Sequence, residues 1–61
     1  NLNQFIKQYR MEKAKELLTD TQMKISAIGT KIGYPNSSYF CKTFNDYFGI
    51  SPEKFREKEG F

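Results

Sequence analysis

The chain has 61 residues, which suffice for one small domain but not for a large hydrophobic core. It contains no histidine, no tryptophan and a single cysteine, so it lacks the side chains from which zinc sites and catalytic triads are usually built. This composition argues against an enzyme and against a bound metal or other cofactor. Cys41 has no partner for an intrachain disulfide, and no apolar run approaches the roughly 20 residues of a membrane helix. We therefore expect a cytoplasmic protein without a membrane segment.

Charge is unevenly distributed along the chain, whose formal net charge is +3. Up to residue 45 basic residues are in excess: Lys7, Arg10, Lys13, Lys15, Lys24, Lys31 and Lys42 stand against Glu12, Glu16 and Asp20. After residue 45 acidic residues outnumber basic ones. Because a basic surface attracts polyanions, this distribution suits a polyanion bound on one side of the domain.

The first predicted element is a long amphipathic helix over residues 3–19. Its apolar residues recur three and four positions apart, which places them on one helical face: Leu2, Phe5, Ile6, Tyr9, Ala14, Leu17 and Leu18. Asn1 or Asn3 can cap its start. The polar residues 19–22 interrupt the apolar period and predict a short connection.

A second, shorter helix is predicted over residues 25–32, where Ile25, Ile28 and Ile32 share one face. Gly33 can close it in a left-handed conformation. Pro35 disfavours helix at the residue before it, so residues 33–36 form a tight turn. Either Asn36 or Ser37 can cap the next helix.

Aromatic residues define the third predicted helix, over residues 37–47. Phe40, Phe44 and Phe48 recur at four-residue spacing, with two tyrosines beside them, and we interpret this stripe as core and not as a platform for stacking nucleic-acid bases. Gly49 ends the helix. The pair Ser51-Pro52 then starts a terminal helix over residues 52–58.

Two short helices joined by a glycine-containing turn form a helix-turn-helix within an all-α fold. In such a unit the second, recognition helix enters the major groove of DNA while the first helix braces it. Gly29 lies on the bracing helix, where a minimal side chain permits a close crossing of the two helices.

The candidate site follows from the geometry of the recognition helix. If Phe40 and Phe44 point inward, the rotation of about 100° per residue turns polar residues outward. We expect base contacts from four of these, with Lys42 well suited to guanine acceptors: Ser37, Ser38, Cys41 and Lys42. Phosphate contacts are expected from Lys24 and Ser26 at the start of the bracing helix, and from Arg10 and Asn45.

The pattern of these residues resembles the AraC/XylS family of transcription regulators over nearly the whole chain, and is most similar to the variant fused to two-component receiver domains. The matching positions are Arg10, Ala14, Leu17, Leu18, Ile25, Ser26, Ile28, Gly33, Tyr34, Ser38, Tyr39, Phe40, Phe44, residues 48–52, Phe55 and Arg56. Gly29, Lys24 and Asn45 depart from the family, which usually has Ala, a capping Ser or Thr, and Lys there.

The resemblance implies a homeodomain-like three-helix core preceded by a long linker helix, residues 3–19. It further implies a first helix-turn-helix unit that is absent from the 61 residues, and base contacts at the positions of Ser37, Ser38, Cys41 and Lys42. The predicted function is sequence-specific binding of double-stranded DNA. The alternative is a protein-interaction module whose acidic end, Glu53 to Glu59, contacts RNA polymerase or a partner regulator.

Overall fold

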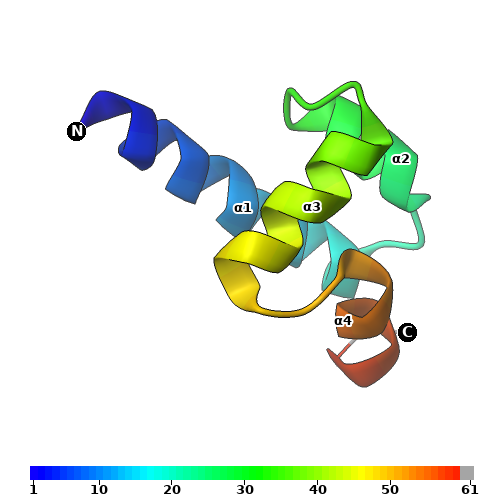
Figure 1. Cartoon of the computed structure of the whole chain (residues 1–61). Coiled ribbons are helices and arrows are strands. Elements are labelled where there is room, and N and C mark those ends of the chain that lie inside the picture. The colour runs from blue at the N-terminus through cyan, green and yellow to red at the C-terminus, as the bar shows by residue number, and fades with distance from the viewer. Residues whose placement is uncertain (60–61) are drawn as a thin grey trace.

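The computed structural model describes residues 1–59, and the regular elements among them are four helices joined by short connections (Figure 1). They are α1 (Leu2–Asp20), α2 (Ile25–Lys31), α3 (Ser37–Phe48) and α4 (Pro52–Glu59). Each end lies within a single residue of the boundary that the sequence suggests. The expected all-α fold class is confirmed.

Side-chain caps and glycines explain where the helices begin and end. The Asn1 side chain accepts a hydrogen bond of 3.0 Å from the Gln4 amide at the start of α1, and Asn36 accepts one of 3.0 Å from the Tyr39 amide at the start of α3. At the far end of α3, Gly49 adopts a φ of 77°, a left-handed conformation that closes the helix.

The core lies between the C-terminal half of α1 and the helices α2 and α3. Its fully buried apolar side chains, each with 0% exposure, are Met11, Ala14, Leu18, Ile28, Phe40 and Phe44. Phe44 is the centre of an aromatic cluster, with ring centroids 6.0 Å from Phe40, 4.7 Å from Phe48 and 5.8 Å from Phe55. Because Phe55 belongs to α4, this cluster joins α3 to the terminal helix.

The expectation that all apolar residues of the first helix share one buried face was wrong. Phe5 and Tyr9 are 69% and 65% exposed, and the N-terminal half of α1 projects beyond the other helices (Figure 1). Phe5 precedes Ala14 by nine residues, which at about 100° per residue is two and a half turns, so the two side chains point to opposite sides of α1. Met11, two full turns before Leu18, occupies the buried face instead.

Helices α2 and α3 approach closely at Gly29. A Cβ atom at this position would lie 3.0 Å from the Tyr34 carbonyl oxygen and 3.1 Å from the Phe40 ring. The close crossing expected from the sequence is therefore present. The same contact opposes the gain of about 1 kcal/mol in helix propensity that alanine would otherwise bring.

Arg56 attaches α4 to the end of α1. Its guanidinium donates hydrogen bonds of 3.2 Å to the Leu18 carbonyl and 3.3 Å to the Thr21 carbonyl. Carbonyls at a helix C-terminus have no partners within the helix. One side chain from α4 therefore satisfies backbone groups that α1 leaves free.

Candidate nucleic-acid interface

Helix α3 has a buried inner face and an exposed, polar outer face. Phe40, Thr43 and Phe44 point inward and hold the helix against the core. The outer face consists of the exposed residues Ser37, Ser38, Tyr39, Lys42, Asn45 and Asp46. These side chains offer hydroxyl, amide, ammonium and carboxylate groups that can donate or accept hydrogen bonds, as base edges in a DNA groove require.

The expected outward orientation of Cys41 is not observed. Its side chain is half-buried and packs against the core cluster. This burial raises the pKa of the Cys41 thiol, and the nearby Glu53 carboxylate adds to the effect. The reason for the difference is that Cys41 lies only about 60° around the helix from Phe44 and about 20° from Phe48, which also packs against the core.

Lys42 is exposed on the outer face and forms an ion pair within α3. Its ammonium lies 3.4 Å from a carboxylate oxygen of Asp46, one turn further along α3. The two side chains are 75% and 58% exposed. Because these are the only charged residues of α3, the outer face carries no net charge.

The other expected phosphate contacts are distributed over α1, α2 and α3. Lys24 and Ser26 are exposed at the start of α2, and Lys24 makes no side-chain cap there. Asn45 is exposed on α3. All three are therefore accessible to a ligand.

Arg10 serves mainly in packing. Its guanidinium lies 5.3 Å from the centroid of the Tyr34 ring, in cation–π geometry, and a Cβ atom on Gly33 would come within 3.2 Å of it. Glycine is favoured at position 33 because its φ of 104° is left-handed, and also because a Cβ atom there would crowd Arg10. Arg10 thus braces the turn between α2 and α3 from α1.

Two outer-face residues were missed by the sequence-based assignment. Tyr39 is 57% exposed, with its ring 5.6 Å from Tyr34 in edge-to-face contact. Asp46 pairs with Lys42 as described. The sequence pattern groups Tyr39 with the aromatic stripe. Yet it lies about 100° around the helix from Phe40 and about 140° from Phe44, and these two angles together indicate exposure.

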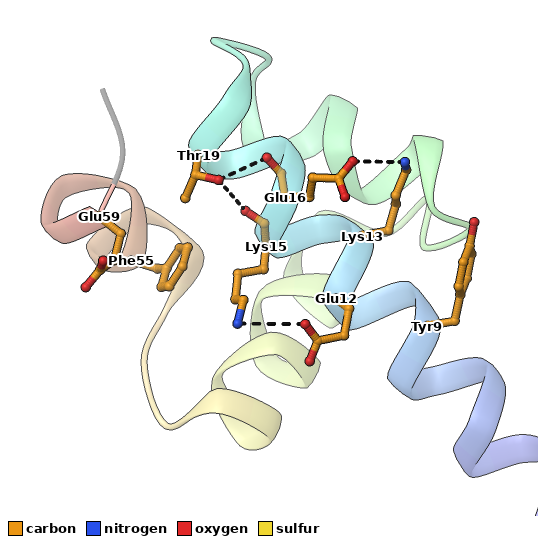
Figure 2. A pocket seen from close by; sticks show the side chains of 8 residues that line it. All are labelled: Tyr9, Glu12, Lys13, Lys15, Glu16, Thr19, Phe55 and Glu59. Carbon is orange, nitrogen blue, oxygen red and sulfur yellow. Dashed lines mark hydrogen bonds and ion pairs between the residues drawn. The ribbon is translucent and has the colours of Figure 1, made fainter.

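A hollow of about 570 Å³ lies between α1 and α4 and contains no residue of α3 (Figure 2). It is lined by Tyr9, Glu12, Lys13, Lys15, Glu16, Thr19, Phe55 and Glu59. Its lysines are paired across one helical turn: Lys13 with Glu16 at 3.1 Å and Lys15 with Glu12 at 3.7 Å. Since these charges are already matched, the hollow offers no concentrated cationic site to a nucleic acid.

Within residues 1–59, no helix combines the length and apolar character that crossing a bilayer requires. The family model described as a helix-turn-helix domain matches residues 1–58.

Bacterial regulators are among the relatives. The chain is 44% identical over 55 residues to the transcriptional activator CsvR of Escherichia coli, covering 90% of the chain and 21% of that protein. It is 42% identical over 55 residues to the DNA-binding dual transcriptional regulator Rns of the same organism, with the same coverage. The chain thus spans about a fifth of the length of these relatives.

Solved structures agree with the fold. The C-terminal domain of the two-component response regulator yesN from Fusobacterium nucleatum superimposes with a TM-score of 0.86 at 37% identity, covering 88% of this chain and 52% of that one. The C-terminal domain of AraT, a response regulator from Geobacillus stearothermophilus, gives a TM-score of 0.87 at 36% identity, covering 90% and 46%. With a matching family model, similar relatives and the same fold, the chain belongs to the AraC/XylS family of helix-turn-helix transcription regulators.

Proposed function

We propose that the chain is a DNA-contacting unit of a cytoplasmic bacterial transcription regulator, and that it binds double-stranded DNA sequence-specifically with α3 in the major groove. The observation that carries this proposal is the outer face of α3, which is polar and exposed while the opposite face is anchored by fully buried Phe40 and Phe44. A helix held in this way can present side chains to base edges without rearrangement.

Individual roles are assigned from position. Ser37, Ser38 and Lys42 read bases, with Lys42 donating to guanine acceptors. Cys41 lies half-buried at the margin of this face and contacts a base only with the exposed part of its side chain. Lys24 and Ser26 bind phosphate and set the register of α2 on the backbone, and Asn45 adds a weaker phosphate contact. Arg10 makes a phosphate contact only with the part of its guanidinium that Tyr34 leaves free.

The exposed apolar stripe of α1 supports a larger arrangement. We propose that α1 connects this unit to a first helix-turn-helix unit of the same protein, which covers Leu2, Phe5, Ile6 and Tyr9. Support comes from the coverage of the two solved C-terminal domains, of which this chain spans 52% and 46%. Large apolar side chains left this exposed are typical of an interaction surface.

Fluorescence anisotropy with a labelled mixed-sequence duplex tests the phosphate contacts. A single unit contacts few phosphates, so binding should be weak and should fall linearly with the logarithm of salt concentration, by about 0.9 log units per phosphate for each tenfold increase. Lys24→Ala should reduce that slope by about 1. Lys54→Ala, at an exposed position of α4, is the matched control and should leave it unchanged.

The alternative is a protein-interaction module, with RNA polymerase or a partner regulator bound at the acidic end of the chain. Helix α4 contains Glu53, Glu57 and Glu59, but three basic residues alternate with them, so the helix carries no net charge.

In the anisotropy experiment, a tight complex with duplex that is insensitive to salt would contradict the proposed phosphate contacts. Equal salt slopes for Lys24→Ala and Lys54→Ala would contradict them too.

A further inference from the structure

The role of Asp46 goes beyond the proposed function and rests on it. Asp46 supplies the one carboxylate of α3, and the only hydrogen bond or ion pair of its side chain among the described residues is the 3.4 Å contact with Lys42. Both side chains are on the outer face, four positions and therefore about one helical turn apart. The carboxylate is thus placed beside the side chain that is best suited to a guanine.

Helix stability does not account for Asp46. The residue lies in the last turn of α3, where the helix dipole presents its negative end and disfavours a carboxylate. Ion pairs between side chains as exposed as these contribute little to folding. No buried group depends on the Asp46 side chain, since it is exposed and bonds only to Lys42 among the residues that the structure describes.

The pair has a direct consequence for DNA. A phosphate that binds Lys42 competes with Asp46 for the ammonium and lies a few ångströms from the Asp46 carboxylate, which repels it. A guanine edge offers the same ammonium two neutral acceptors and brings no full negative charge to the carboxylate. Asp46 therefore penalises the phosphate contact more than the base contact.

We propose that Asp46 is a specificity-determining residue that restrains Lys42 and suppresses its binding to DNA phosphates, so that Lys42 is released mainly to a guanine edge. Lys24, which is not on α3, then provides phosphate attraction, and the recognition helix itself contributes little sequence-independent affinity. Selectivity then has two sources: contacts with the preferred DNA sequence, and weaker binding of all other sequences because of Asp46.

Asp46→Asn tests this directly, because asparagine keeps the size of the side chain and removes its charge. The variant should bind a mixed-sequence duplex about fivefold more tightly at low salt, the effect of one unit charge a few ångströms away in water. Its salt slope should increase by about 1, since Lys42 then acts as an additional phosphate ligand. Glu57→Gln, at an exposed position of α4, is the matched control for net charge.

Comparison of the two variants distinguishes a local effect of Asp46 from a general effect of net charge. A larger gain in affinity and slope for Asp46→Asn than for Glu57→Gln supports the restraint. Equal changes overturn it, while duplex binding by the unmodified chain leaves the proposed function intact. If the unmodified chain and both variants fail to bind any duplex at low salt, the proposed function fails and this inference fails with it.

A double-mutant cycle tests whether Asp46 acts through Lys42. In a Lys42→Ala background, Asp46→Asn should lose most of its effect on affinity and slope. The full effect in that background would overturn the restraint of Lys42 and leave only general repulsion by Asp46. Thermal unfolding followed by circular dichroism should give closely similar Tm values for all these variants, because none of the altered side chains is buried.

Discussion

The inner and outer faces of α3 carry different kinds of side chain in different surroundings. The inner face contains Phe40 and Phe44, with 0% exposure and edge-to-face contact across 6.0 Å. The outer face contains Ser38 and Lys42, which touch little of the protein. One short helix therefore has two roles: its inner face stabilises the fold, and its outer face is available for binding. Substitutions on the inner face should change the stability of the fold. Substitutions on the outer face should change DNA binding at nearly constant stability.

The largest effect is expected from Phe44→Ala on the inner face. Truncating a fully buried phenylalanine costs about 3 to 5 kcal/mol, and a domain of this length is stabilised by only about 3 to 9 kcal/mol. The substitution should therefore remove about a third or more of the unfolding free energy of the domain, with weaker binding as a secondary result. Urea denaturation followed by circular dichroism measures the change. A loss below about 1 kcal/mol would show that the aromatic cluster does not hold α3.

Gly29→Leu tests the crossing that sets the direction of the outer face. A side chain at Gly29 must displace the Tyr34 carbonyl or the Phe40 ring, and overpacking of this kind costs about 1 to 3 kcal/mol. Gly29→Ala is the milder control and should cost less, because its gain in helix propensity offsets the close contact. Thermal unfolding compares the two. Equal stability of the leucine variant and the unmodified chain would mean that α2 and α3 are not tightly crossed.

Lys42→Ala should change binding and leave stability nearly constant. Loss of a lysine contact to guanine weakens binding to a preferred duplex by about 1 to 3 kcal/mol, while the unfolding free energy should change by less than about 0.5 kcal/mol. Anisotropy against a duplex selected from a random pool measures the first quantity, with Lys54→Ala as control. Unchanged affinity would remove Lys42 from the residues that read bases.

The smallest effect is expected from Phe5→Ala, although phenylalanine is large. The side chain is 69% exposed, so its truncation should change the unfolding free energy of the 61 residues by less than about 0.5 kcal/mol. In a longer form of the protein that includes the proposed first unit, the same substitution should cost clearly more. Equal small costs in both forms would contradict the proposed contact between that unit and the apolar stripe.

Local signals in the sequence predicted the fold well. Asn36 before α3 and Gly49 after it each act within one turn of chain, so helix ends could be predicted from neighbouring residues alone. The burial of α1 was harder, because periodicity cannot show where a helix extends beyond its partners. Phe5 and Ala14 both fit an apolar repeat, yet they lie on opposite sides of the helix.

The site was predictable only in part, because the missing contacts depend on tertiary structure. The outward position of Lys42 follows from helical rotation. The half-burial of Cys41 depends on how wide the packed face is. The bonds from Arg56 to the Leu18 and Thr21 carbonyls connect residues far apart in the chain, and nothing in the local sequence indicates them.

Amide chemical-shift mapping by NMR is the most direct test of the central claim that the outer face of α3 binds DNA. The chain is titrated with a short mixed-sequence duplex at low salt, and the titration is repeated at moderate salt. Shift changes should cluster at residues 24–26 and 36–45 and should fade as salt increases. Shift changes absent from these residues, or confined to residues 53–59, would contradict the claim and favour the protein-interaction alternative.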